Sequence, residues 1–131
     1  MNTQRLIETL QLEPHPLEGG YYKRTYQSQL SVATKTGERS LMSSIYYLLT
    51  QEQPIGYFHQ NRSDIVHYYH LGGAIAYWLV SPDGAVERRV MGSDLAAGQD
   101  LQLTVPGGYW KASELNSGEF ALISEAVAPG F

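Results

Sequence analysis

The residues best suited to chemistry lie in one polar stretch near the middle of the chain, residues 57–73. It holds three of the four histidines, His59, His67 and His70, together with Asp64. Imidazole has an ordinary pKa near neutral pH, and a neighbouring carboxylate can orient it for proton transfer. Because apolar, strand-like runs lie on both sides of this stretch, we expect a ligand site here. The alternative is that these histidines have structural roles in a β-rich protein.

Short alternating or apolar runs separated by glycine and proline predict a fold made of β-strands. We expect strands at residues 20–26, 41–50, 55–59, 65–70, 74–80, 85–91, 101–105, 109–113 and 119–127. Residues 31–39 are polar and indicate a hairpin-like connection. A short helix is predicted at residues 3–10, with Thr3 as its N-cap. About ten short strands with one helix are typical of an antiparallel sandwich or closed barrel.

Length and composition limit the classes of protein to consider. The 131 residues, with no repeat or linker, predict a single domain over residues 1–131. The net charge of −4 and the scattered Lys and Arg residues argue against a nucleic-acid partner, because phosphate binding requires clustered cations. The sequence has no cysteine, which excludes disulfides and thiolate metal sites.

The sequence also carries expectations about location and partners. The N-terminus lacks the apolar core of a signal peptide, and no apolar run approaches the ~20 residues of a membrane helix. We therefore expect a cytoplasmic protein without a membrane partner. Charged residues form only 17% of the chain, which favours a surface partly covered by a second subunit. The alternative is a monomer whose surface is rich in tyrosine, serine and glutamine.

Five segments, in chain order, carry a family resemblance. They read LEPHPLEGGYYKRTYQS, SSIYYLLT, FHQNRSDIVHYYHLGG, GSDLAAGQDLQLTVPGGYWKAS and LISEAVAPGF. Together they cover nearly the whole chain and resemble the cupin family once described as a domain of unknown function, DUF985, also called cupin_5. The resemblance implies an all-β fold, the cupin double-stranded β-helix or jelly-roll barrel, with a short N-terminal helix, and it implies a homodimer. Members are similar in fold to RmlC-type sugar-nucleotide epimerases and to seed storage proteins.

The two motifs that hold a metal in other cupins are only partly matched. If His59 takes the second histidine position of the first motif, Tyr57 takes the first and Ile65 takes the glutamate position. In the second motif, Lys111 stands at the histidine position. A protonated ammonium group cannot ligate a cation. We therefore expect no bound metal and no cofactor.

The stretch also departs from the usual pattern of its own family, in which many members read Ser-Asp-Glu-x-Trp-His. Here His67 takes the tryptophan position and Tyr68 the histidine position. The roles that the family gives to those positions are therefore not carried over to these residues. His67 and His70 lie three apart in a predicted strand and should face opposite sides. A metal held by His59, Asp64 and one of these two histidines is the alternative to a metal-free site.

The interior of a cupin barrel is the expected ligand site, because barrel mouths collect concave surface of mixed polarity. The residues expected to bind a ligand there are Tyr22, Arg24, His67, His70, Trp110, Lys111 and Glu125. Since side chains alternate along a strand, only about half of such candidates should point inward. For Trp110 and the tyrosines, the alternative is a place in the core or in a dimer interface.

Three functional hypotheses follow. The first is a metal-independent isomerase or epimerase that acts on a small polar, carbohydrate-like molecule. In it His59, oriented by Asp64, would take a proton beside a carbonyl group, and Tyr68 or Tyr22 would return one. A cation such as Lys111 would stabilise the enolate. The second hypothesis is a binding module without turnover, and the third, metal-dependent oxygen chemistry, is disfavoured by the missing ligands.

Overall fold

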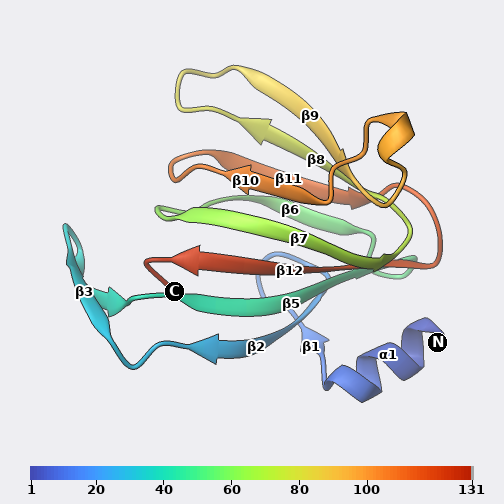
Figure 1. Cartoon of the computed structure of the whole chain (residues 1–131), viewed down its shortest axis with the longest axis horizontal. Helices are drawn as coiled ribbons and strands as arrows, with labels where there is room; N and C mark the ends of the chain where they lie inside the picture. Colours follow the sequence, from blue (N-terminus) through green and yellow to red (C-terminus); the bar gives the residue numbers. More distant parts are fainter. Residues whose placement is uncertain (131) are drawn as a thin grey trace.

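Two antiparallel sheets face each other in the computed structural model, which describes residues 1–130 (Figure 1). The larger sheet has the order β1 (Glu13–Pro14), β2 (Tyr21–Gln27), β5 (Ser43–Thr50), β12 (Phe120–Ala128), β7 (Asp64–Gly72) and β10 (Gln102–Val105). The smaller sheet has the order β6 (Ile55–Gln60), β11 (Trp110–Leu115), β8 (Ile75–Val80) and β9 (Val86–Met91). This arrangement is the jelly-roll barrel expected from the sequence.

The remaining elements lie outside the two sheets. A hairpin of β3 (Ser31–Thr34) and β4 (Gly37–Ser40) projects from one end of the barrel, and helix α1 (Thr3–Leu10) lies near the other end (Figure 1). A single 3-10 turn, η1 (Leu95–Ala97), precedes β10. Within the described part of the chain, no helix is both long enough and apolar enough to cross a membrane.

The helix and the main strands were predicted closely, with differences at their ends. The N-cap prediction at Thr3 is wrong by one residue, because the side chain of Asn2 accepts the Arg5 N–H at 2.9 Å and Asn2 has extended backbone angles. Strand β1 was not predicted, since its two residues include Pro14. A proline is tolerated there because β1 is an edge strand that pairs with β2 alone.

Strand β5 shows why its sequence is almost continuously apolar. Ile45, Tyr47 and Leu49 face the space between the two sheets and belong to the main core. Leu48 points to the opposite face, yet it is fully buried because α1 and the segment after it cover that face. This second cluster consists of Leu6, Leu12, Leu48, Phe120 and Leu122. A strand buried on both faces needs apolar residues at both alternating sets of positions.

Polar side chains interrupt the core at one level of the barrel. In the larger sheet, Glu125 of β12 lies opposite His67 of β7 and Ile45 of β5. In the smaller sheet, Lys111 of β11 lies opposite His59 of β6. These strands are held on both sides by neighbours, except β6, which forms an edge. The scaffold therefore places ionisable groups from both sheets toward the same interior space.

Candidate functional site

A cavity of about 490 Å³ opens at this level of the barrel. Its walls come from the loop before β2 and from strands β2, β5, β6 and β12 with the residue after β6. The lining residues are His15, Leu17, Glu18, Tyr22, Arg24, Ile45, Phe58, His59, Gln60, Asn61 and Glu125. The volume suits a small molecule, and the wall combines apolar surface with several convergent polar groups.

At the bottom of the cavity lies a group of buried ionisable side chains, His67, Lys111 and Glu125, which we name the floor cluster. Glu125 lines the cavity. Lys111, which is 4% exposed, lies behind Glu125 and contacts its carboxylate. Lys111 Nζ lies 3.3 Å from Glu125 Oε1 and 2.7 Å from His67 Nε2. His67 is fully buried, and its Nδ1 lies 3.0 Å from the carbonyl oxygen of Leu103. The cluster is thus hydrogen-bonded from the cavity surface to the backbone of β10.

The contacts of the floor cluster fix its protons. A carbonyl oxygen can only accept, so His67 Nδ1 carries the proton and donates it to Leu103, leaving Nε2 to accept from Lys111. Burial, and then the charge of Lys111, lower the pKa of His67 to about 3, so its ring is neutral. Burial alone would raise the pKa of Glu125, but the neighbouring Lys111 ammonium holds that pKa below its ordinary value. Glu125 is therefore an ionised carboxylate at the cavity surface.

A second group of side chains, His15, Glu18 and His59, borders the cavity closer to solvent, and we name it the rim cluster. Glu18 lies between the two imidazoles, with Oε2 2.7 Å from His15 Nε2 and Oε1 in contact with His59 Nε2. Nε2 of His59 is buried and has no hydrogen-bond partner within residues 1–130. Its contact with Glu18 therefore has the distance of an ion pair but not the geometry of a hydrogen bond. The other nitrogen of His59, Nδ1, lies 2.9 Å from the carbonyl oxygen of Tyr57.

Two buried tyrosines lie between these clusters and the core. The hydroxyl of Tyr47 donates to the carbonyl oxygen of Gly19 at 2.7 Å, which ties the loop carrying Glu18 to the barrel. Tyr77 packs its ring edge-on against His67, with 5.2 Å between ring centroids. Its hydroxyl is buried and has no hydrogen-bond partner among the described residues. Burial raises the pKa of both hydroxyls, so both tyrosines are neutral.

Six of the ten predicted site residues lie at the cavity or directly behind it. Tyr22, Arg24, His59 and Glu125 line the cavity, whereas Lys111 and His67 contact Glu125 or its partner. The expected pairing of His59 with Asp64 is not found. His59 contacts Glu18 instead, and Asp64 is an exposed residue that accepts the Gly107 N–H at 2.8 Å.

The other three predicted residues lie away from the cavity. Tyr68 follows the buried His67 in β7 and points to the opposite face, as strand alternation requires. His70 lies on that outer face, where its Nε2 is 2.5 Å from Ser124 Oγ. Trp110 begins β11 and is largely exposed. The histidine stretch therefore contributes two residues to the clusters, and its polar character alone does not show which two.

The residues that sequence reasoning missed are His15, Glu18, Tyr47 and Tyr77. The first two lie in the segment HPLE, which reads as a turn between a helix and a strand. A histidine and a carboxylate three residues apart in a turn can face each other, and that spacing was the available signal. Tyr47 and Tyr77 lie in apolar runs, where a buried tyrosine cannot be distinguished from an ordinary core residue by sequence.

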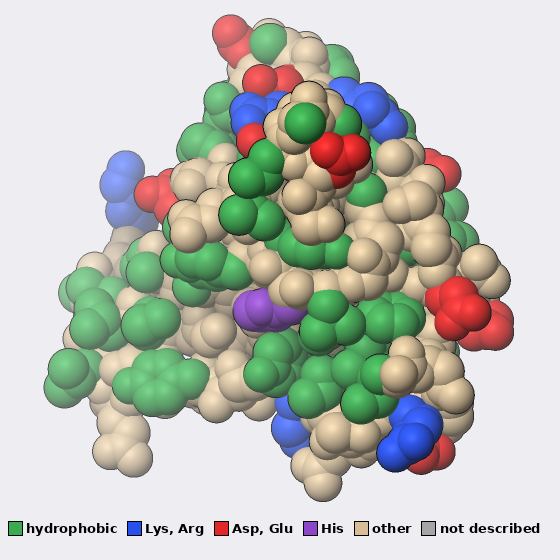
Figure 2. Space-filling model, turned by 45° about the vertical axis from the view of Figure 1, so that its right-hand side comes forward, with side chains coloured by type: hydrophobic (Ala, Val, Ile, Leu, Met, Phe, Trp, Pro, Cys, Tyr) green, Lys and Arg blue, Asp and Glu red, His purple; other side chains and the backbone are tan. Residues whose placement is uncertain are grey.

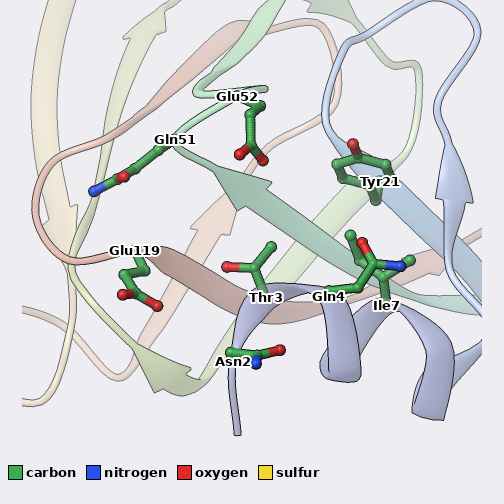
Figure 3. Close-up of a pocket in the computed structure, with 8 residues that line it drawn as sticks. All are labelled: Asn2, Thr3, Gln4, Ile7, Tyr21, Gln51, Glu52 and Glu119. Carbon is green, nitrogen blue, oxygen red and sulfur yellow. The ribbon is translucent and has the colours of Figure 1, made fainter.

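A second hollow of about 330 Å³ lies beside the start of α1 (Figure 3). Figure 3 shows side chains from α1 on one side and Gln51, Glu52 and Glu119 on the other. These two carboxylates are exposed, and the hollow is lined by none of the buried ionisable groups of the barrel. The interior cavity is therefore the candidate functional site.

Comparison with known proteins places the chain in a family. Residues 4–131 match the family described as Cupin_5, cupin superfamily (DUF985). The chain belongs to this cupin family. An uncharacterized protein of Saccharomyces cerevisiae, YML079W, is 41% identical over 143 residues, which cover 98% of this chain and 70% of the yeast protein. A hypothetical protein from Leishmania major is 31% identical with a TM-score of 0.92, over 100% of this chain and 83% of that one.

A more distant likeness shows the cupin fold alone. Oxalate decarboxylase matches with a TM-score of 0.65 and 17% identity, over 93% of this chain and 29% of that enzyme. The cupin fold predicted from the five sequence segments is confirmed by the family match and by the two facing sheets. Figure 2 shows one face of this cupin, where hydrophobic and uncharged side chains fill the middle and charged ones lie mostly toward the edges.

Oxalate decarboxylase of Bacillus subtilis has Mn(II) centres, which raises the question of whether the barrel residues of this cupin fit a metal. They do not, because the Lys111 ammonium contacts both His67 Nε2 and Glu125 Oε1, and its charge keeps a cation away from these two atoms. Within residues 1–130, no group of three or more His, Asp or Glu side chains is placed to hold a metal. The alternative metal site, made of His59, Asp64 and one further histidine, is not formed. His59 contacts Glu18 instead, and Asp64 accepts a hydrogen bond from the Gly107 N–H.

Proposed function

We propose that the barrel cavity binds a small polar, carbohydrate-like carbonyl compound and that the protein is a metal-independent isomerase or epimerase. One observation carries the proposal. An ionised, buried carboxylate and an imidazole–carboxylate pair, Glu125 and His59–Glu18, line the same cavity of about 490 Å³. Reactions that move a proton next to a carbonyl group require two such groups, one to accept a proton and one to donate it.

The rest of the wall supports a polar ligand of modest size. Arg24 can pair with a carboxylate or phosphate group, and the side chains of Gln60 and Asn61 can both donate to and accept from hydroxyl groups. Ile45 and Phe58 supply apolar surface that can contact the ring or chain of a sugar-like molecule. This mixture of a few polar groups and apolar cover is typical of sites for small metabolites.

The alternative is a binding module without turnover, and one observation favours it. Each nitrogen of His59 and His67 already has a partner or a close contact inside the protein. A bound molecule is therefore not needed to complete these contacts, and proton transfer requires the contact between His59 and Glu18 to rearrange. The two functions differ in whether a bound molecule exchanges protons with the solvent.

We also propose that the protein is a homodimer, as the family resemblance implies. Exposed apolar side chains of the smaller sheet line a shallow groove, among them Ile55 and Tyr57. A second copy of the chain would cover this surface. Light scattering of the purified protein should give about twice the mass of one chain, 14.6 kDa, and Ile55→Glu should shift the result toward the monomer mass. A monomer mass for the unchanged protein would contradict the dimer.

The experiment that tests the enzyme is solvent exchange in D₂O. Nucleotide sugars and sugar acids are incubated with the protein, and NMR follows loss of the hydrogen next to the carbonyl group. We expect exchange in at least one compound, and we expect Glu125→Gln to slow it by at least about 100-fold. The matched control is His70→Gln on the outer face, which should keep the full rate. Compounds that raise the melting temperature without any exchange would favour the binding module.

A further inference from the structure

We propose that Glu125 is the general base of this site and that His59 enters the reaction protonated, as the proton donor. Glu18 and His15 are then positioning residues for His59, and Lys111 and His67 are positioning residues for Glu125. The inference rests on the proposed function for its reaction, but the proton positions on which it depends follow from the contacts of the side chains. It reverses the role of base that the sequence suggests for His59.

The two nitrogens of His59 both face atoms that can only accept a hydrogen bond. Nδ1 lies 2.9 Å from the carbonyl oxygen of Tyr57, so it carries a proton. Nε2 lies against Oε1 of Glu18, and the close approach of these two atoms is favourable only when the pair carries a proton. The His59–Glu18 pair therefore holds one proton beyond the one on Nδ1, which makes it an imidazolium paired with a carboxylate.

The second imidazole of the rim cluster cannot supply that proton. His15 Nδ1 accepts the backbone N–H groups of Leu17 at 3.2 Å and Glu18 at 3.0 Å, so it carries no proton. The proton of His15 therefore lies on Nε2, which is 2.7 Å from Glu18 Oε2. This contact holds the Glu18 carboxylate in place, with Oε1 against His59. The transferable proton of the rim cluster is thus the one shared by His59 and Glu18.

In the floor cluster, unlike the rim cluster, the group that faces the cavity carries no proton. Lys111 donates to Glu125 Oε1, and the neighbouring His67 cannot donate to Glu125, because its single proton is used by the carbonyl oxygen of Leu103. Glu125 is left as a carboxylate that faces the cavity from the middle of a six-stranded sheet. One cavity therefore contains a fixed proton acceptor and a proton donor.

The reaction step that these two groups can perform is an enolisation. The Glu125 carboxylate takes the proton from the carbon next to the carbonyl group, and the electrons of that C–H bond form the C=C bond. Once Glu18 has moved aside from Nε2, the carbonyl oxygen takes the proton of Nε2 from the His59 imidazolium, which becomes neutral. The enol forms without a net change of charge in the cavity, and return of the protons to carbon restores both groups. The step needs no metal and no further reactant.

The direction of the pH dependence follows from this assignment. The charged or titratable groups that face His59 are Glu18, His15, Lys111, Glu125, His67 and Arg24. If His59 donates its proton, the rate of solvent exchange falls as pH rises and the imidazolium is lost. Without its carboxylate partner the imidazolium is less stable, so Glu18→Gln should move this fall to lower pH. A rate that rises with pH through the titration of His59 would assign the base role to His59 and overturn the proposal.

A measurement without any substrate tests the proton positions directly. NMR of protein labelled with ¹⁵N in its histidine side chains distinguishes doubly protonated rings from the two neutral forms. With both proteins in the same buffer, we expect His59 to be doubly protonated in the wild-type protein and neutral, with its proton on Nδ1, in Glu18→Gln. His67 should be neutral with its proton on Nδ1 in both proteins, and the signals of the exposed His70 should be the same in both. A neutral His59 in the wild-type protein would overturn the proposal.

The two measurements separate this proposal from the proposed function. An imidazolium at His59 with no exchange in any compound contradicts the isomerase and the catalytic roles built on it, while the proton positions stand. Exchange that requires Glu125 but occurs with a neutral His59 supports the isomerase and overturns the assignment of the donor. Exchange that survives Glu125→Gln unchanged overturns Glu125 as the base, whatever the state of His59.

Discussion

The floor cluster and the rim cluster border one cavity, and each consists of a glutamate with two basic side chains beside it. In the floor cluster a lysine stands beside the carboxylate, and His67 is fully buried and neutral. In the rim cluster a second histidine takes the place of the lysine, and the side chains are 16–23% exposed. The identity of the third side chain and its distance from solvent therefore decide where the protons lie.

The scaffold explains why the clusters differ. Glu125 and His67 come from neighbouring strands in the larger sheet, so their register is set by the hydrogen bonds of β12 and β7. His15 and Glu18 come from the loop before β2, which is attached to the barrel by the hydrogen bond from Tyr47 to Gly19. A carboxylate on a rigid strand suits a fixed acceptor, whereas a loop-borne carboxylate can move when a ligand approaches His59.

Lys111→Met gives the largest expected effect. The change removes the cation beside Glu125 and leaves a buried carboxylate without its partner, so the free energy of unfolding should fall by about 3–5 kcal/mol. Urea denaturation at pH 7 measures this loss. The double variant Lys111→Met with Glu125→Gln removes both charges and should recover a large part of the stability. If the double variant is no more stable than the single one, the loss comes from packing rather than from the unpaired charge.

The pH dependence of stability isolates His67. Its pKa in the folded protein, about 3, lies below the ordinary value of 6.5. As pH falls below 6.5, the unfolded chain binds a proton that the folded protein does not bind, so stability is present above that pH and is lost as pH falls. One proton contributes about 1.4 kcal/mol per pH unit, which gives about 2 kcal/mol between pH 6.5 and 4.5.

The variant His67→Gln should lack this part of the slope, whereas His70→Gln should keep it. Thermal or urea unfolding of the three proteins between pH 6.5 and 4.5 makes the comparison. Equal slopes for the wild-type protein and His67→Gln would show that His67 is not held neutral. They would also contradict the description of the floor cluster as a set of fixed protons.

The two buried tyrosines provide a smaller, paired test. Tyr47→Phe removes the hydrogen bond to Gly19 and should cost about 1 kcal/mol of stability. Tyr77→Phe removes a buried hydroxyl that has no partner within residues 1–130, so stability should stay unchanged or rise by up to about 1 kcal/mol. Urea unfolding of both variants shows the difference in sign. A clear loss in Tyr77→Phe would indicate that its hydroxyl binds an ordered water in the cavity region.

The fold could be predicted from the sequence because its signals are local. Alternation, turn residues and the five family segments place the helix and the main strands within one or two residues of their positions. Strand β1 was not predicted, because a two-residue strand containing Pro14 carries little apolar pattern. The hairpin-like connection predicted at residues 31–39 is the hairpin of β3 and β4. The almost continuous apolar character of β5 fits its position in the interior of the larger sheet, between β2 and β12.

The candidate site could be predicted only in part, because its contacts join residues far apart in the chain. His59, Lys111 and Glu125 were selected from residue type and family position, but the partner of His59 was placed at Asp64, five residues away, instead of at Glu18. Register across β6 and β11, and the path of the loop before β2, decide which side chains meet. Strand alternation did separate the buried His67 from the exposed Tyr68 once the register of β7 was known.

Glu18→Gln gives the smallest expected effect on stability and the sharpest contrast with Lys111→Met. The rim side chains are partly exposed, so water screens their charges and stabilises His59 when its partner is lost. The free energy of unfolding at pH 7 should change by less than about 1 kcal/mol. Glu13→Gln, an exposed carboxylate in β1, is the matched control for the loss of one charge. A cost for Glu18→Gln as large as that of Lys111→Met would mean that the rim is as tightly fixed as the floor. Glu18 could then not release His59 for a ligand, and the site would be better described as a binding module.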